Sequence, residues 1–295
     1  MAFRAAEYDR YTGPRSKRPA WWPLMSATLL RGWSSQWVRR LTWLSLIQGF
    51  SLCVLMYVLN DVIPTWRETA QMVGSSVQMQ DEFTIDARLY LRLLNLFVYP
   101  VLMPLALLFG YDLISKDIET NATEAYFARP ITPLSYLMGR TLAFIGFLLA
   151  ATLGPMLMVW VADYATSADG HFETIKAVPG GMTLALAFIA TSLALLVQAV
   201  SILTRSGTWT NLIFLMVFLF GHAMAYILYE MTDNLNMLSM SILHNTFVIC
   251  AAALGELDRF DDHAPAALSF LVMGVAAAVS FLILLRGLGR RSMLG

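Results

Sequence analysis

The stretch from Ala177 to Thr204, AVPGGMTLALAFIATSLALLVQAVSILT, decides the fold because it contains no charged residue. A helix needs about 20 mostly apolar residues to cross the hydrocarbon of a bilayer, where backbone polar groups must be satisfied within the helix itself. This stretch therefore predicts a transmembrane span. The whole chain agrees, since 58% of its 295 residues are hydrophobic and only 14% are charged, against about 25% in an ordinary soluble domain.

Charge-free windows elsewhere in the chain predict an all-α polytopic membrane protein with six transmembrane helices in a single domain, 41–285. The predicted spans are 41–59, 93–111, 141–162, 182–204, 208–229 and 264–285. A seventh window, 234–255, is rich in polar residues such as His244 and Asn245. We expect it to be an interfacial or re-entrant segment, made of two short helices, rather than a span.

The formal net charge is zero, with 20 basic and 20 acidic residues. This balance excludes a basic nucleic-acid binder and the high net charge of a disordered chain. Six spans with both ends in the cytoplasm put most Lys and Arg inside, as the positive-inside rule requires. Residues 1–40 are then a cytoplasmic N-terminus and 286–295 a cytoplasmic tail. Within the former, Leu29, Leu30, Trp33 and Trp37 recur at helical spacing among arginines and predict an amphipathic interfacial helix.

The predicted spans hold few polar groups and no deep Asp, Glu, Lys or Arg, which disfavours an ion-coupled transporter. Gln48 in the first span is a candidate pathway residue. His222 is predicted to be a hydrogen-bonded packing residue rather than a haem ligand. In the third span one small-residue face predicts close helix packing; its members are Gly146, Ala150 and Gly154.

Motifs of hydrolases, zinc proteases and P-loop nucleotide sites do not occur in the sequence. The two cysteines, Cys53 and Cys250, do not form a C-x-x-C pair. We therefore expect a non-catalytic chain that holds no metal or cofactor of its own.

The segment between the second and third predicted spans, DLISKDIETNATEAYFARPITPLSYLMGR from Asp112 to Arg140, is too long for a simple linker. Leu113, Ile114 and Ile118 recur at helical spacing, and acidic and aromatic residues follow. Aromatic side chains supply buried anchor area in protein interfaces and charges set orientation. Two interpretations stay open from the residues alone: a partner-docking helix, or a solvated connection between two spans.

This segment resembles the cytoplasmic loop of ABC-2 type permeases, the membrane subunits of a large class of ABC exporters. Asp117 and Glu119 match the acidic pair of the family pattern, and Tyr126 and Phe127 match its bulky turn. Glu124 follows the acidic pair, and Arg140 stands where Lys is common in the family. The remaining matches are Arg129, Pro130, Ile131, Tyr136 and Gly139. Two positions depart, because Asn121 and Ala122 stand where Gly-Thr is usual. Asn tolerates a left-handed backbone, so we expect a turn at Asn121.

The resemblance implies a permease subunit that pairs with a second copy or a paralogue in the inner membrane of a bacterium. The loop is then the coupling helix that docks on a separate cytoplasmic ATPase, and ATP-Mg is expected on that partner chain. The docking residues it implies are Asp117, Glu119, Glu124, Tyr126, Phe127, Arg129 and Pro130.

Two other classes of function stay open: a non-transporting membrane scaffold or assembly subunit, and a secondary transporter. The sequence does not identify the transported substrate.

Overall fold

The computed structural model describes residues 19, 21–62, 87–127, 131–167, 171–260 and 262–292. Over these residues the chain is helical and contains no strand. The helices of the first half are α1 (Trp21–Ser34), α2 (Gln36–Tyr57), η1 (Val58–Val62), α4 (Ala87–Phe97), η2 (Val98–Leu102), α5 (Met103–Gly110), α6 (Ser115–Glu119) and α7 (Ala122–Phe127). Those of the second half are α8 (Pro133–Thr166), α9 (His171–Ile175), α10 (Val178–Thr204), α11 (Gly207–Thr232), η3 (Leu235–Met240), α12 (Ile242–Ala253), η4 (Leu257–Arg259) and α13 (Ala266–Ser292).

Six helices are long and apolar enough to cross a membrane, and each contains one predicted span or nearly all of it. They are Gln36–Val62, Ala87–Glu119, Pro133–Thr166, His171–Thr204, Gly207–Thr232 and Ala266–Gly289. Most extend beyond the charge-free windows, because a charged residue ends the apolar stretch without ending the helix. The described residues therefore contain the six helices of spanning length that were predicted, as is typical of a membrane protein.

The segment 234–255 consists of two short helices, η3 and α12, as predicted. Helix α12 has 12 residues, too few to span a bilayer of ordinary thickness. Its first residues are fixed by Ser241, whose hydroxyl oxygen caps the helix by accepting the backbone N–H of His244 at 3.0 Å.

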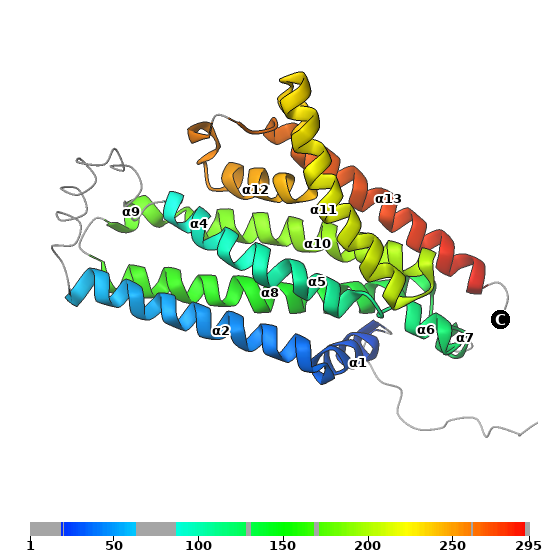
Figure 1. Ribbon diagram of the computed structural model, residues 1–295. Coiled ribbons are helices and arrows are strands. Elements are labelled where there is room, and N and C mark those ends of the chain that lie inside the picture. Colours follow the sequence, from blue (N-terminus) through cyan, green and yellow to red (C-terminus); the bar gives the residue numbers. More distant parts are fainter. Residues whose placement is uncertain are drawn as a thin grey trace, which may run out of the picture.

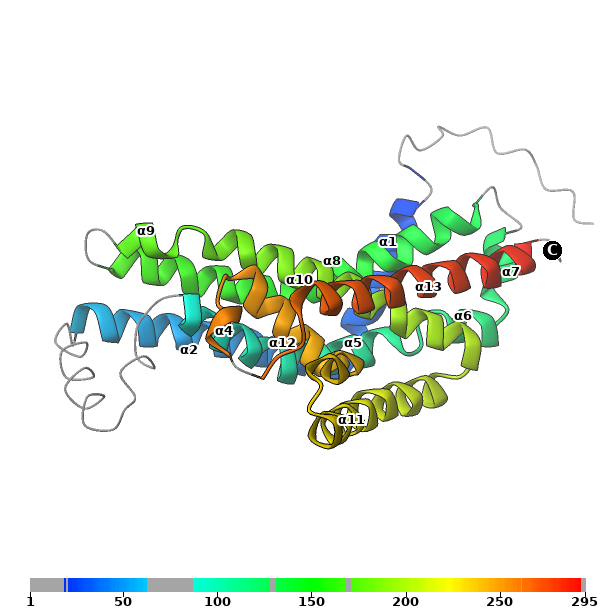
Figure 2. The same cartoon turned by 90° about the horizontal axis from the view of Figure 1, so that it is seen from above.

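The long helices run side by side, with α2, α8 and α10 aligned and α11 leaning across them (Figure 1). At one end of the bundle lie α1, α6, α7 and the end of α13, and we call this the α6 end. The opposite end carries α9 and the start of α4, and we call it the α9 end. The view from above shows the same division (Figure 2).

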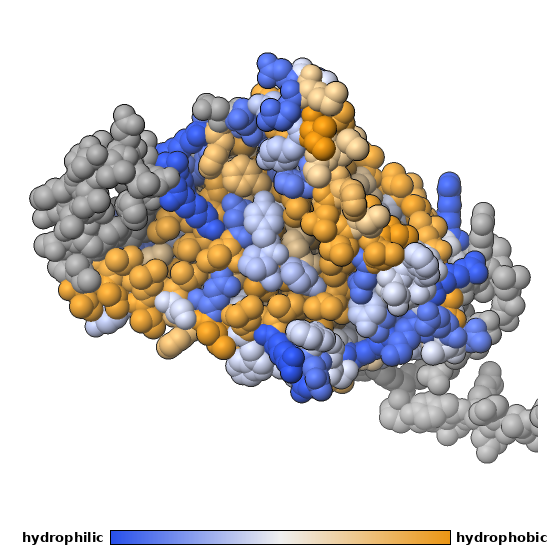
Figure 3. All heavy atoms as spheres, in the orientation of Figure 1, coloured by the Kyte–Doolittle hydropathy of each residue, from blue (hydrophilic) through white to orange (hydrophobic). Residues whose placement is uncertain are grey.

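Three of the six spans of the described residues are largely uncovered. In their apolar stretches 17% of residues are buried in α2 and in α11 and 22% in α13, against 61% for the second and fourth spans. Orange apolar side chains cover much of α2 and α11, while hydrophilic side chains gather at both ends and in a patch between α5 and α11 (Figure 3). We call the surface formed by α2 and α11 the uncovered flank. Its apolar side chains suit contact with lipid tails, and the hydrophilic patch within it does not.

The predicted small-residue face of the third span does not pack against another helix in the described part of this chain. Nothing lies within 4 Å of a Cβ added to Gly146 or Gly154. The close helix contact of α8 lies elsewhere, where Gly49 of α2 meets Pro155 at 2.6 Å from such an added Cβ. The packing prediction for this face therefore stays a prediction, because spacing identifies a face without identifying what lies against it.

Candidate functional site

The segment between the second and third spans folds as two short helices, α6 and α7, separated at Asn121. Asn121 has a φ of 53°, in the left-handed region that ends a right-handed helix. The turn expected at this position is therefore confirmed. Leu113, Ile114 and Ile118 are buried, so the apolar side of the segment faces the protein body rather than solvent.

Helix α6 is held to the bundle by backbone and hydroxyl groups. The backbone N–H of Ser115 donates to Oγ of Ser201 on α10 at 3.0 Å. The Ser201 hydroxyl donates in turn to the carbonyl oxygen of Tyr111 at 3.1 Å. These bonds satisfy polar groups at the start of α6 that its own short length leaves without helical partners.

The centre of the site is the carboxylate of Asp117, which is buried on α6 and accepts from three side chains. Arg140 of α8 pairs with its Oδ2, and the Tyr136 hydroxyl donates to the same oxygen at 2.7 Å. Arg31 of α1 reaches Oδ1 at 3.2 Å. Tyr136 and Arg140 are four residues apart and so project from one face of α8.

Arg140 is itself almost fully enclosed, with 4% of its side chain exposed. It donates to Thr28 Oγ1 of α1 at 2.9 Å, and its guanidinium lies 5.5 Å from the Tyr136 ring centroid and 5.9 Å from that of Tyr126 on α7. One buried ion pair therefore joins α1, α6, α7 and α8. We call Thr28, Arg31, Asp117, Tyr136 and Arg140 the Asp117 network.

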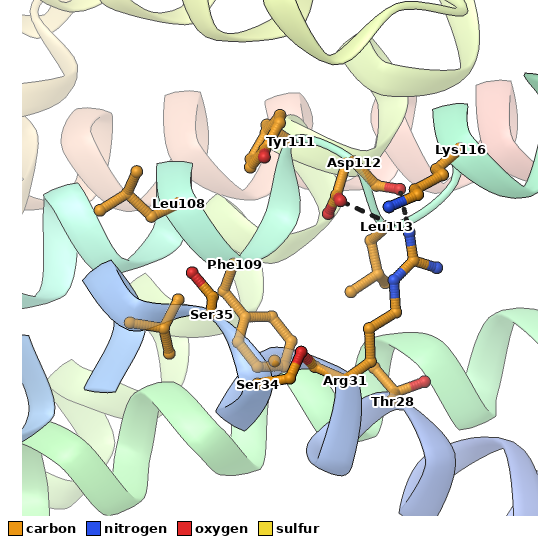
Figure 4. Close-up of a pocket in the computed structure, with 12 residues that line it drawn as sticks. Thr28, Arg31, Ser34, Ser35, Leu108, Phe109, Tyr111, Asp112, Leu113 and Lys116 are labelled. Atoms are coloured by element: carbon orange, nitrogen blue, oxygen red, sulfur yellow. Dashed lines mark hydrogen bonds and ion pairs between the residues drawn. The ribbon is translucent and has the colours of Figure 1, made fainter. Parts of the chain in front are cut away.

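A small cavity of about 210 Å³ lies beside this network, between α1 and the end of α5. Arg31 extends across it toward Asp112 (Figure 4), with 3.4 Å between Nη2 and Oδ2. Both side chains are about 30% exposed, so this pair is screened by water and weaker than the Asp117–Arg140 pair.

The predicted docking residues fall into three groups. Asp117 is buried, with 6% of its side chain exposed, so it positions α6 and does not offer a contact to a partner. Glu119 is exposed and Tyr126 is half-buried against Tyr136, with ring centroids 5.7 Å apart. Glu124 and Phe127 lie on α7, but their side chains lie outside the described residues, as do Arg129 and Pro130.

Two members of the network, Thr28 and Arg31, were not among the predicted site residues. They precede Asp117 by more than 80 positions, and a contact over that separation leaves no periodic signal. Tyr136 was recognised only as a match to the family pattern, and Arg140 only as a basic residue where Lys is common in the family. The structure adds the physical reason for both residue types, which is the need to compensate a buried carboxylate.

The remaining candidate, Gln48, is half-exposed on α2, where its Nε2 donates to the carbonyl oxygen of Leu96 at 3.1 Å. It therefore ties α2 to α4 at the uncovered flank. His222 of α11 lies 2.8 Å from Oγ of Ser241 through Nδ1. This contact confirms the prediction that His222 is a hydrogen-bonded packing residue.

A second polar cluster lies at the α9 end, around the buried carboxylate of Asp163 in the last turn of α8. Tyr90 donates to Asp163 Oδ2 at 2.7 Å, Asn60 donates to Oδ1 at 3.1 Å, and His171 lies 3.2 Å from Oδ2. Asp163 is three residues from the end of α8. It is therefore a terminal polar cluster and not a charge at the middle of a span.

Within the described residues, no group of three or more His, Cys, Asp or Glu side chains is arranged to hold a metal ion. Comparison with protein-family models gives no match, and comparison with curated proteins gives none either.

Proposed function

We propose that this protein is the membrane-spanning permease subunit of an ATP-binding cassette exporter, which moves its substrate using ATP hydrolysed by a separate ATPase subunit. The observation that carries the proposal is the α6–α7 segment, which follows the second span and is joined to α8 and α1 by the Asp117 network. The resemblance of Asp112–Arg140 to the loop of ABC-2 type permeases supports the same assignment.

A coupling element must transmit force, so it must not detach from the span that it moves. The buried Asp117–Arg140 pair meets this requirement, because separating two desolvated charges costs far more than breaking a surface ion pair. Arg31 adds a link from the same carboxylate to α1. A push on α6 would therefore move α8 and α1 together.

A docking surface also needs side chains that are free to meet a partner. Lys116 and Glu119 are exposed on α6, and Asn121 is exposed at the turn between α6 and α7. By this proposal they meet the ATPase together with Phe127 and Arg129 of the family pattern. Asp117 acts behind this surface as a positioning residue.

The uncovered flank of α2 and α11 supports pairing with a second copy or a paralogue. It presents apolar side chains around a more polar patch, and Gln48 lies at its edge. By the proposal, the substrate pathway runs between two such flanks across the inner membrane of a bacterium, with the α6 end in the cytoplasm. The concentration of Arg and Lys in the segments of that end is consistent with this orientation.

The proposal predicts an ABC ATPase gene beside this one, and co-expression with that ATPase tests it. We expect a stable complex in which Glu119→Lys lowers both association and permease-stimulated ATP hydrolysis, since it reverses charge on the docking surface. The sequence pattern predicts the same for Phe127→Ala and Arg129→Glu. Glu173→Lys, on exposed α9 at the other end, is the matched control and should leave both unchanged.

Association and ATP hydrolysis that are unaffected by all three loop changes would refute the docking assignment. A purified chain that binds no ATPase would favour the scaffold or assembly subunit. Substrate movement driven by an ion gradient without ATP would favour the secondary transporter.

A further inference from the structure

The structure contains a cavity of about 390 Å³ that the coupling proposal does not use. It lies between η2, α11, α12 and the loop that leads to α13. Its lining residues are Tyr99, His222, Tyr226, Leu243, His244, Phe247 and Asp262. The volume is within the range of pockets that hold small organic molecules. We call it the aromatic cavity.

The walls of the aromatic cavity are mostly rings. The centroid of Tyr226 lies 4.8 Å from that of His222 and 6.2 Å from that of His244, and the His244 ring lies 6.5 Å from Phe247. The faces of tyrosine and phenylalanine rings carry partial negative charge, which attracts a cation placed over them.

The described lining of the aromatic cavity includes neither Lys nor Arg, and a hydrogen bond keeps His244 neutral. The backbone N–H of Ala264 donates to Nε2 of His244 at 3.1 Å. A nitrogen that accepts a hydrogen bond carries no proton, so His244 is neutral. Neither Lys nor Arg is among the described lining residues, and an anion would therefore find no opposite charge here.

The one formal charge in the lining is the carboxylate of Asp262. Tyr229 donates to its Oδ1 at 2.7 Å, which orients the group and leaves it exposed at the mouth of the cavity. Two further exposed acidic residues near Tyr229, Glu230 and Asp233, add negative potential of the same sign. A neutral apolar guest would gain nothing from this carboxylate.

We propose that the aromatic cavity binds a hydrophobic organic cation, with the charged centre near Asp262 and its apolar groups against Tyr99, Tyr226 and Phe247. As a statement about the exported substrate, this inference rests on the proposed function. As a statement about binding, it stands on the cavity alone.

The test measures binding of tetraphenylphosphonium to the full chain in nanodiscs, with empty nanodiscs subtracted. Tetraphenylborate is the matched control, because it has nearly the same shape and the opposite charge. We expect saturable binding of the cation and none of the anion. Asp262→Asn should weaken binding roughly fivefold, and Asp258→Asn, which removes a charge outside the cavity, should not.

A second pair of variants tests the contribution of the aromatic rings to binding, independently of the Asp262 carboxylate. Tyr226→Leu should also weaken binding roughly fivefold, while Phe220→Leu, exposed on the same helix outside the cavity, should leave it unchanged. If Tyr226→Leu does not fold, the Asp262 and Asp258 pair still decides the matter, because both of those side chains are exposed.

Equal binding of the two ions, no binding of the cation, or equal effects of Asp262→Asn and Asp258→Asn would each overturn the inference. None of these measurements involves an ATPase. A chain that binds the cation but no ATPase would refute the proposed export function and leave the cavity assignment intact. A chain that binds an ATPase but not the cation would refute the cavity assignment and leave the export function intact.

Discussion

Replacing Asp117 by Asn tests whether the α6 segment is fixed to the bundle by a buried charge. The change keeps the size of the side chain and removes the charge that compensates Arg140, of which only 4% is exposed. Removing one partner of a buried ion pair costs about 3–5 kcal/mol, because the other charge stays desolvated. Asp117→Asn should therefore be among the most destabilising polar substitutions in the molecule.

The other members of the Asp117 network should rank below it. Tyr136→Phe removes one hydrogen bond to a charged oxygen, worth about 1.5–3 kcal/mol, and leaves the ion pair in place. Arg31→Gln removes a half-exposed partner, so we expect a loss of about 1 kcal/mol or less. This order follows from burial, since Tyr136 is fully buried and Arg31 is partly exposed.

The assay must detect local release, because α6 has only five residues and could leave the bundle without unfolding it. Hydrogen exchange of the amides in α6, followed by mass spectrometry, reports both local and global opening. A loss of 3 kcal/mol corresponds to an increase of about 100-fold in exchange. Amides of α10 near its centre serve as the internal reference for global unfolding.

The double variant Asp117→Leu with Arg140→Met is the decisive control. It removes both buried charges, and Arg31 keeps Asp112 and its contact with water. The double variant should therefore be more protected than either Asp117→Leu or Arg140→Met alone. Protection within about tenfold of wild type in Asp117→Asn would refute the reasoning. So would a double variant less protected than both single variants.

Three further predictions concern the backbone, helix packing and topology. Asn121→Ala should lower the free energy of unfolding of the α6–α7 segment by about 1 kcal/mol, because alanine is strained at a φ of 53°; hydrogen exchange would show faster opening, and Asn121→Gly should not show it. Gly49→Ala should destabilise the protein by about 1–3 kcal/mol, because its Cβ would meet Pro155 at 2.6 Å. Gly154→Ala, which meets nothing within 4 Å, should be neutral or stabilising in the same thermal assay. Single cysteines at Glu119 and Glu173 should react with an impermeant thiol reagent from opposite sides of the membrane; labelling from one side would refute the topology.

Much of the fold was predictable because the bilayer makes a simple demand on sequence. A span must be long and apolar, and a charge-free window of sufficient length is therefore a direct signal of it. The same argument predicted that 234–255 is not a span, because its polar residues are unfavourable in the bilayer. The structure has two short helices there. The turn at Asn121 was predictable because few residues other than glycine adopt its backbone conformation readily.

The candidate site was predictable only in part. Acidic and aromatic composition marked the segment between the second and third spans, but it did not separate the exposed Glu119 from the buried Asp117, two positions away. That difference depends on which side of a five-residue helix faces α8. Periodicity is too weak a signal over such a length to decide it.

By itself, the sequence determined the number of spans, the polar segment before the last one and the loop that carries the family pattern, because these depend on local composition. Tertiary structure alone decided that Arg31 and Thr28 join Asp117, that the Gly146 face lies open, and that rings from three helices enclose the aromatic cavity. These features arise where helices distant in sequence meet, and the energies involved depend on burial. Burial is a property of the packed chain and not of any one segment.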